Sequence, residues 1–335
     1  MAIIDVTRSY DRLVAIGDEV GNEASKSLAQ LDSDHPLLAN ITARLLREDS
    51  SQNSIFRLIP FPIMGALGSD PKQAFPLAVA SRIWWTGVEV FDDLSDGHNK
   101  AIADENNSAQ IAVASAACIV AIPLAILNEK MPQTGLATGW EREFVSSSMS
   151  AAEGQLADIN PSVDAPTWAT VMKIYAAKSG SPYARDAAIA SRLAGADDKQ
   201  ERGWRAFGKL FGVLRQLAND RAAESPDVDE DLINGTRTLL IAHAIELATS
   251  NGDMDSLMEL RIQAQSDPEA RKSLTELLLA PTVSNSYNKR IKEIHQKLGS
   301  IVQDLVPNSD HRNLIHWMLS ISSRSAQLGD SRRSQ

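Results

Sequence analysis

Apolar residues recur along most of the chain at the spacing of three to four residues that places them on one face of an α-helix. Runs that combine β-branched and aromatic residues between turn signals are scarce, so few strands are expected. Short breaks separate the helical segments, and several contain a proline, such as Pro60, Pro71, Pro161 and Pro226. The pattern predicts an all-α chain with helices at residues 8–31, 36–48, 73–97, 108–128, 136–156, 166–194, 199–223, 235–250, 254–279, 286–304 and 309–327.

No repeat of fixed period and no long linker interrupts this pattern. We therefore expect a single domain over residues 1–335, with residues 326–335 as a flexible tail. Residues 111–127 are uncharged and apolar, but they contain Pro123 and fall short of the roughly 20 residues that span a bilayer. This segment favours a buried core helix, and no stable membrane insertion is expected. Because the N-terminal residues carry charges within their apolar runs, we do not expect them to form a signal peptide.

Composition narrows the function classes. The 33 Lys and Arg against 43 Asp and Glu give a net charge of −10, which argues against a nucleic-acid partner because phosphate binding requires clustered cations. Bulk acidity leaves a local basic pocket for a small anion open. Cys118 is the only cysteine, which rules out a disulfide framework and indicates a reducing, cytoplasmic location.

The most informative segment is an acidic motif that follows an apolar helix. Asp92, Asp93 and Asp96 form a DDxxD pattern, and Glu89 extends the acidic stripe by one turn. Oxygen-rich clusters of this kind suit Mg²⁺, which bridges carboxylates to substrate phosphates. A solvated acidic helix end is the alternative interpretation. The preceding turns favour the metal site because they are heavily apolar, with Trp84, Trp85, Val88, Val90 and Phe91.

A second acidic segment follows another apolar run. Gln216, Asp220 and Glu224 share one helical face, and Asn219 flanks it. Two acidic helix ends that face each other across a cavity could hold Mg²⁺ ions on a diphosphate from both sides. Cations that could assist are Lys178, Arg215, Arg221 and Arg237, although each taken alone is more typical of a surface charge than of a ligand.

Taken in order, these motifs resemble the polyprenyl synthetase family of trans-isoprenyl diphosphate synthases, over about residues 55–245 of this chain. The resemblance implies the class I isoprenoid-synthase fold, a helical bundle around a central cavity. The matching segments are DDxxD at 92–96, Glu153-Gly154-Gln155 with Asp158, Lys178-Ser179, Gln216–Asp220 and Arg237-Thr238-Leu239.

The departures from the family pattern lie where the resemblance places the acceptor, isopentenyl diphosphate. Residues 55–60 keep Arg57 but carry Phe56 and Ile59 in place of a Lys and an Arg, and Trp85 replaces a His. Because an acceptor diphosphate needs several cations in a partly desolvated site, these replacements predict loss of acceptor binding. The second acidic motif also departs, reading Asn-Asp-x-x-Ala.

The expected function is Mg²⁺-dependent ionisation of an allylic diphosphate, farnesyl or geranylgeranyl, with the cation then cyclised in an apolar cavity. The resemblance implies three Mg²⁺ ions around the diphosphate, with Mn²⁺ as a substitute, and a homodimer. Metal ligands would be Asp92, Asp93, Asp96, Asn219, Asp220 and Glu224. Diphosphate ligands would be Arg57, Lys178, Arg221 and Arg237. Cavity residues would be Trp85, Val88, Glu89, Phe91, Gln155 and Gln216.

Three alternatives stay open. The chain also resembles a family branch that transfers a prenyl group to a peptide tryptophan, and it could be a chain-elongating synthase with an unusual acceptor site. A non-catalytic subunit of a prenyl synthase is the third alternative, against which the retained acidic stripe argues.

Overall fold

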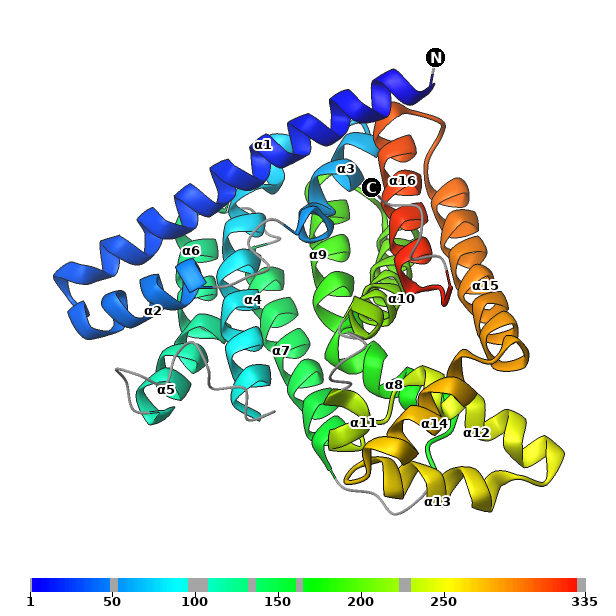
Figure 1. Ribbon diagram of the computed structural model, residues 1–335. Coiled ribbons are helices and arrows are strands. Elements are labelled where there is room, and N and C mark those ends of the chain that lie inside the picture. The colour runs from blue at the N-terminus through cyan, green and yellow to red at the C-terminus, as the bar shows by residue number, and fades with distance from the viewer. Residues whose placement is uncertain are drawn as a thin grey trace. The chain divides into compact units, whose positions relative to one another are not determined.

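The computed structural model describes residues 2–48, 54–95, 108–131, 137–160, 165–222 and 230–329. Within these ranges the secondary structure is helical, with no strand, which confirms the all-α prediction (Figure 1). Short 3₁₀ helices occur at Gln30–Ser33 (η1), Ile55–Leu58 (η2) and Pro71–Ala74 (η3). The α-helices are α1 (Ala2–Ala29), α2 (Pro36–Glu48), α3 (Pro60–Ala66), α4 (Phe75–Ser95), α5 (Ser108–Ile119), α6 (Ala121–Lys130), α7 (Ala137–Ile159), α8 (Trp168–Lys178), α9 (Gly180–Leu193), α10 (Asp198–Ala222), α11 (Glu230–Asn234), α12 (Leu239–Asn251), α13 (Met254–Ala264), α14 (Pro268–Leu279), α15 (Pro281–Leu305) and α16 (Asp310–Ala326).

The chain divides into two compact units, each assembled from three separate stretches. Unit 1 comprises Met1–Met149, Arg185–Arg205 and Leu305–Ile315. Unit 2 comprises Ser150–Ala184, Ala206–Asp304 and His316–Gln335. The prediction of one domain over residues 1–335 therefore stays a prediction. The predicted tail is described only as far as residue 329, where Leu328 is buried and exchanges two hydrogen bonds with Asn288.

Helix α4 is the core element of unit 1 and contacts α1, α2, α5 and α6. Its inward positions are apolar or small, and Leu77, Val79, Ile83 and Trp84 are fully buried. At Gly87 an added Cβ would lie 2.8 Å from the backbone oxygen of Ser115, so the missing side chain lets α5 approach α4 closely. This packing fixes the helix that carries the first acidic motif.

A buried polar network ties α4 to the part of α9 in unit 1. The Nε of Arg185 donates to Asp186 at 2.7 Å, and the hydroxyl of Ser81 donates to the same carboxylate at 2.8 Å. The guanidinium of Arg185 lies 3.9 Å from the ring centre of Phe144 and 4.7 Å from that of Trp84. Because these buried charges are paired and hydrogen-bonded, they specify how the helices of unit 1 pack.

The apolar segment predicted as one core helix forms two helices, α5 and α6, which meet at Val120. One face packs against α4 and buries Ile111, Cys118, Ile126 and Leu127. Of the described residues, Ser108–Lys130 is the one stretch long and apolar enough to cross a membrane, and 44% of its most apolar window is buried inside the protein. A buried core helix passes the same test of length and composition. The sequence pattern favours that interpretation for this segment.

In unit 2 the helix predicted at 166–194 is divided at Ser179. Helix α8 ends at Lys178, and α9 begins at Gly180 with Pro182 in its first turn. Two glycines allow close packing around this break. A Cβ at Gly154 on α7 would collide with the backbone of Lys178, and one at Gly212 on α10 would collide with the backbone of Ser179. The helices therefore bring the residues beside the break next to α7 and α10.

Candidate active site

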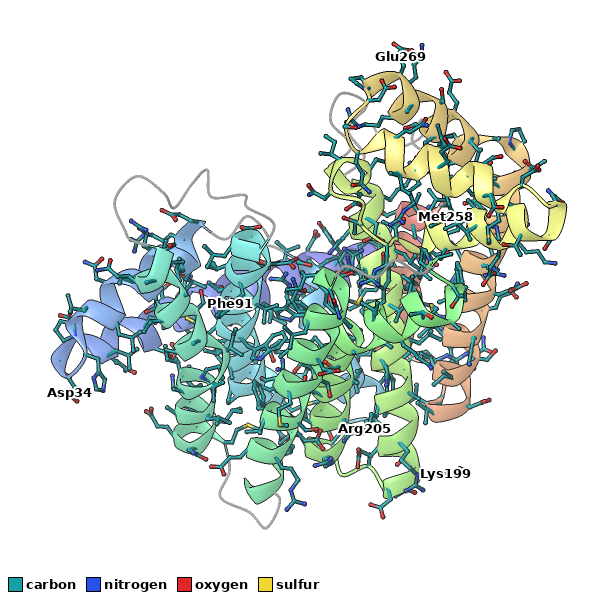
Figure 2. The ribbon with its side chains drawn as sticks, turned by 90° about the horizontal axis from the view of Figure 1, so that it is seen from below. Asp34, Phe91, Lys199, Arg205, Met258 and Glu269 are labelled. Atoms are coloured by element: carbon teal, nitrogen blue, oxygen red, sulfur yellow. The ribbon has the colours of Figure 1, made fainter. Side chains whose placement is uncertain are left out.

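The first acidic motif lies at the end of α4 in unit 1. Asp92 is half-buried and Asp93 is exposed on the last described turns of the helix, beside the half-buried Phe91 labelled in Figure 2. Asp96 falls outside the described residues, as does Glu224 of the second motif. Among the residues that the structure describes, no group of three His, Cys, Asp or Glu could hold a metal ion. The two carboxylates nevertheless provide the hard oxygen donors that Mg²⁺ prefers.

One turn before this motif, η2 and α4 bring three of the predicted site residues together. The guanidinium of Arg57 forms an ion pair with Glu89 and lies 4.4 Å from the ring centre of Trp85. The side chain of Arg57 is 13% exposed and that of Glu89 is 34% exposed, so the pair is partly shielded from solvent. The arginine retained at the predicted acceptor end is therefore held by an acid and an aromatic ring of the same unit.

Trp85 itself is nearly buried and packs edge-on against Trp84, with ring centres 5.2 Å apart. The indole N–H of Trp84 donates to the hydroxyl of Ser148 at 2.8 Å, which fixes Trp84 in the core. Val88 is half-buried on the following turn. The apolar flank of the acidic motif is thus a packed feature of unit 1, and its role as a cavity wall stays a prediction.

Arg57 also lines a cavity of about 370 Å³ in unit 1. The buried Arg82 of α4 contributes a second guanidinium group to its lining, and Leu58 contributes an apolar surface. Residues of α1 complete it, namely Tyr10, Val14, Gly17, Asp18 and Val20. A cavity of this size has the dimensions of a small-molecule site.

In unit 2 the Lys178 ammonium donates to the Asp158 carboxylate at 3.0 Å. Their side chains are 17% and 14% exposed. The half-buried Gln155 lies one turn before Asp158 on α7. The structure therefore joins the predicted Gly-Gln-plus-acid segment to the predicted lysine, and close packing at Gly154 makes this contact geometrically accessible.

The second acidic motif is held by a chain of hydrogen bonds. The phenol of Tyr175 donates to one oxygen of Asp220 at 2.5 Å, and the amide of Gln216 donates to the other at 2.8 Å. The hydroxyl of Ser179 in turn donates to the amide oxygen of Gln216 at 2.6 Å. Both oxygens of Asp220 are thereby oriented, and each retains acceptor capacity for a cation.

The electrostatics of Asp220 are dominated by its burial. Burial raises its pKa from 3.8 to about 7, although the bonds from Tyr175 and Gln216 oppose the shift. The carboxylates of Asp231 and Asp158 raise the pKa further. Burial and the charge of Asp220 raise the pKa of Tyr175 as well. A divalent cation would offset this concentrated negative charge, so the donor set fits Mg²⁺.

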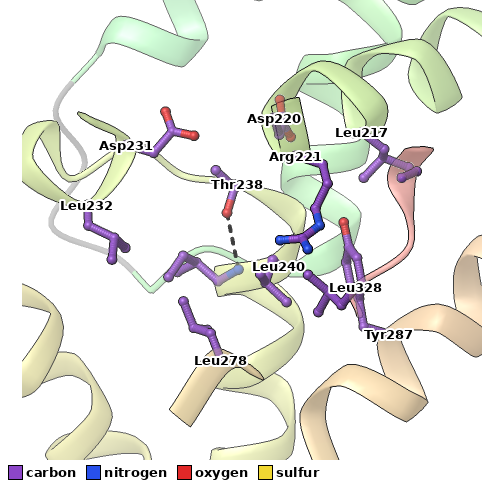
Figure 3. Close-up of a pocket in the computed structure, with 12 residues that line it drawn as sticks. Leu217, Asp220, Arg221, Asp231, Leu232, Thr238, Leu240, Leu278, Tyr287 and Leu328 are labelled. Atoms are coloured by element: carbon purple, nitrogen blue, oxygen red, sulfur yellow. Dashed lines mark hydrogen bonds between the residues drawn. The ribbon is translucent and has the colours of Figure 1, made fainter. Parts of the chain in front are cut away.

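Asp220 borders a small cavity of about 30 Å³, which has room for a few water molecules at most (Figure 3). Arg221 and Tyr287 lie together on one side of it, with Leu232 and Leu278 on the other. Burial lowers the pKa of the Arg221 guanidinium. The cavity combines one cation with two carboxylates, since Asp231 also lines it.

Two other predicted ligands make structural contacts. The guanidinium of Arg237 donates to the backbone oxygens of Ala157 at 2.5 Å, of Asp158 at 3.2 Å and of Asn160 at 2.7 Å, which closes the C-terminal end of α7. Asn219 is exposed and accepts a hydrogen bond from Arg215 at 3.3 Å. The diphosphate role of Arg237 and the metal role of Asn219 stay predictions.

Sequence reasoning missed Tyr175, Tyr287 and Asp231. Tyr175 lies one helical turn before Lys178, and that spacing on a helix was the signal that could have found it. Tyr287 and Asp231 carry no local motif and reach the cavity through tertiary packing alone.

The fold and these donor sets define a class I isoprenoid enzyme. A model described as polyprenyl synthetase matches residues 63–278, more than half of the chain. The octaprenyl diphosphate synthase of Haemophilus influenzae is 22% identical over 325 residues, which cover 92% of this chain and 94% of that protein. The chain belongs to the polyprenyl synthetase family, which confirms the resemblance drawn from the motifs.

Solved structures show the same fold. A geranylgeranyl pyrophosphate synthetase from Pyrococcus horikoshii gives a TM-score of 0.78 at 16% identity and covers 94% of this chain and 99% of its own. A polyprenyl synthase from Caulobacter crescentus, complexed with calcium and isoprenyl diphosphate, gives 0.76 at 18% identity, with 97% and 98% covered. The predicted class I isoprenoid-synthase fold is therefore confirmed.

Proposed function

We propose that this chain transfers an allylic prenyl group from its diphosphate with the help of Mg²⁺, as a chain-elongating prenyl diphosphate synthase. The observation that carries the proposal is the match to the polyprenyl synthetase family, which spans both acidic motifs. The relatives described above are prenyl or polyprenyl synthases by name. They support chain elongation over the cyclisation expected from the sequence.

In this proposal Asp92 and Asp93 provide Mg²⁺ ligands in unit 1, and Asp220 provides a Mg²⁺ ligand in unit 2. The predicted ligands outside the described residues would complete each set. Bound Mg²⁺ would supply Lewis-acid stabilisation of the negative charge that develops on the leaving diphosphate. Tyr175 and Gln216 fix the direction of the Asp220 carboxylate. The chain needs no nucleophilic side chain, because its groups bind and orient the diphosphate while apolar walls exclude water.

The Lys178 ammonium donates to Asp158, and we propose that it pairs with diphosphate oxygens when substrate is present. Farnesyl or geranylgeranyl diphosphate as the substrate, Mn²⁺ as a substitute metal, a homodimer and a cytoplasmic location are further parts of the proposal. They are implied by the family resemblance and the single cysteine.

A second candidate is capture of the cation by its own double bonds or by an acceptor without a diphosphate, such as a peptide tryptophan. One observation favours it. Arg57, retained at the predicted acceptor end, is already paired with Glu89 and stacked on Trp85. Phe56 and Ile59 add no charge beside it.

The test is diphosphate release from farnesyl and geranylgeranyl diphosphate by the pure protein with Mg²⁺, with and without isopentenyl diphosphate. Asp92→Ala should abolish release, whereas Asp34→Ala, which removes an exposed carboxylate in a turn far along the chain from either motif, should not. Retained release in Asp92→Ala would remove the first motif from the mechanism. No release by the unaltered protein under any of these conditions would favour a non-catalytic subunit.

A further inference from the structure

Arg57 is held from two directions by α4. Its guanidinium donates to Glu89, and the ring of Trp85 lies 4.4 Å away on the preceding turn. Glu89 and Trp85 are four residues apart, so they lie on one face of the helix, and both contact the Arg57 guanidinium. With 13% of the Arg57 side chain exposed, the guanidinium is mostly withdrawn from solvent.

The same arginine lines the 370 Å³ cavity that Arg82 also lines. Two guanidinium groups against the one carboxylate of Asp18 in this lining would ordinarily favour a small organic anion. A diphosphate entering here would meet Arg57 already neutralised by Glu89. It would compete with that carboxylate for the guanidinium, and the carboxylate would stay close enough to the phosphate oxygens to repel them.

We propose that Glu89 is a specificity-determining residue that occupies Arg57 and lowers the affinity of this end of the site for a diphosphate acceptor. The inference rests on the proposed function, since it treats Arg57 as part of the acceptor end. It deepens that function because it names the residue that sets how strongly the acceptor's charge is recognised. Trp85 reinforces the effect by holding the guanidinium in a cation–π contact while it is paired.

The test is direct binding of isopentenyl diphosphate by calorimetry, with EDTA present so that the metal motifs do not bind the diphosphate. Glu89→Gln keeps the shape of the side chain and removes its charge, and it should lower the dissociation constant about tenfold. Glu89→Ser serves as a second variant should the first fail to fold. Inorganic pyrophosphate as a second probe should show the same gain, because the effect acts on the diphosphate group.

The matched control is Glu23→Gln in the same unit. Glu23 is 29% exposed and pairs with Lys130 at 2.5 Å, so the substitution removes an equivalent ion pair elsewhere. Its dissociation constant should equal that of the unaltered protein. The gain in affinity from Glu89→Gln should disappear when Arg57→Leu is added. The double variant lacks the guanidinium that becomes available to the ligand once the charge of Glu89 is removed.

Unchanged affinity in folded Glu89→Gln and Glu89→Ser would overturn the proposal. A gain that persists in the double variant with Arg57→Leu would overturn it too, since Glu89 would then act by another route. Failure of the proposed function is separately visible, because it would show as no diphosphate release from an allylic substrate by the unaltered protein, whatever the binding results.

Discussion

Replacing Asp220 with Asn should stabilise the metal-free protein at neutral and alkaline pH. Burial raises the pKa of this carboxyl from 3.8 to about 7, a shift of about three units. At about 1.36 kcal/mol per unit, the ionised form costs at most about 4 kcal/mol of folding free energy, and less where water reaches the half-buried carboxylate.

The direction with pH follows from the raised pKa. Protonated Asp220 contributes its full stability below about pH 4, and this contribution is lost as the pH rises to about 7. Asparagine carries no charge at any of these pH values. Its amide oxygen can still accept from Gln216, and its amide nitrogen can donate to the phenol oxygen of Tyr175.

The assay is denaturant unfolding in EDTA between pH 4.5 and 8.5, with Asp34→Asn as the exposed control. The difference in unfolding free energy between Asp220→Asn and the unaltered protein should grow with pH and level off above about pH 7. Added Mg²⁺ should stabilise the unaltered protein at pH 8 more than the variant, because the metal neutralises the carboxylate. A difference independent of pH, or a variant less stable at pH 8, would refute the reasoning.

Two further predictions concern unit 2. Tyr175→Phe should raise the Mg²⁺ concentration for half-saturation about tenfold, since Asp220 loses the phenol that orients it. The buried Tyr183 offers the control, and a calorimetric Mg²⁺ titration in which Tyr175→Phe and Tyr183→Phe behave alike would contradict the positioning role. Gly212→Ala should lower the unfolding free energy by about 1–3 kcal/mol, because the added Cβ meets the backbone of Ser179. An unchanged denaturation midpoint would show that α10 can shift away at no cost.

The local pattern of apolar and polar residues was sufficient to predict that the chain is helical and where most helices lie. The helix predicted at 36–48 has those bounds in the structure, because Pro36 begins it and its apolar residues face one side. The break at Ser179 was missed because the helical periodicity continues through it, and Gly180 and Pro182 carry a turn signal too weak to outweigh that period. The break at Val120 was missed for the same reason, since β-branched and small residues alone do not mark a helix end.

Local sequence pattern predicts even less of the candidate site than of the helix bounds. Gln216 and Asp220 lie one turn apart on α10, so their contact follows from spacing alone. Tyr175 is 45 residues from Asp220, and Arg57 is 32 residues from Glu89, so these pairings depend on how separate helices pack. The sequence identifies the charged residues of each motif, but which of these groups pair with one another is a property of tertiary structure.

Product analysis of the pure protein by mass spectrometry tests the central claim most directly. The protein would be incubated with Mg²⁺ and geranyl, farnesyl or geranylgeranyl diphosphate, each with and without saturating isopentenyl diphosphate. Chain elongation predicts a longer prenyl diphosphate that forms only when isopentenyl diphosphate is present. A hydrocarbon or alcohol formed from an allylic diphosphate alone, with no longer diphosphate in any mixture, would contradict it.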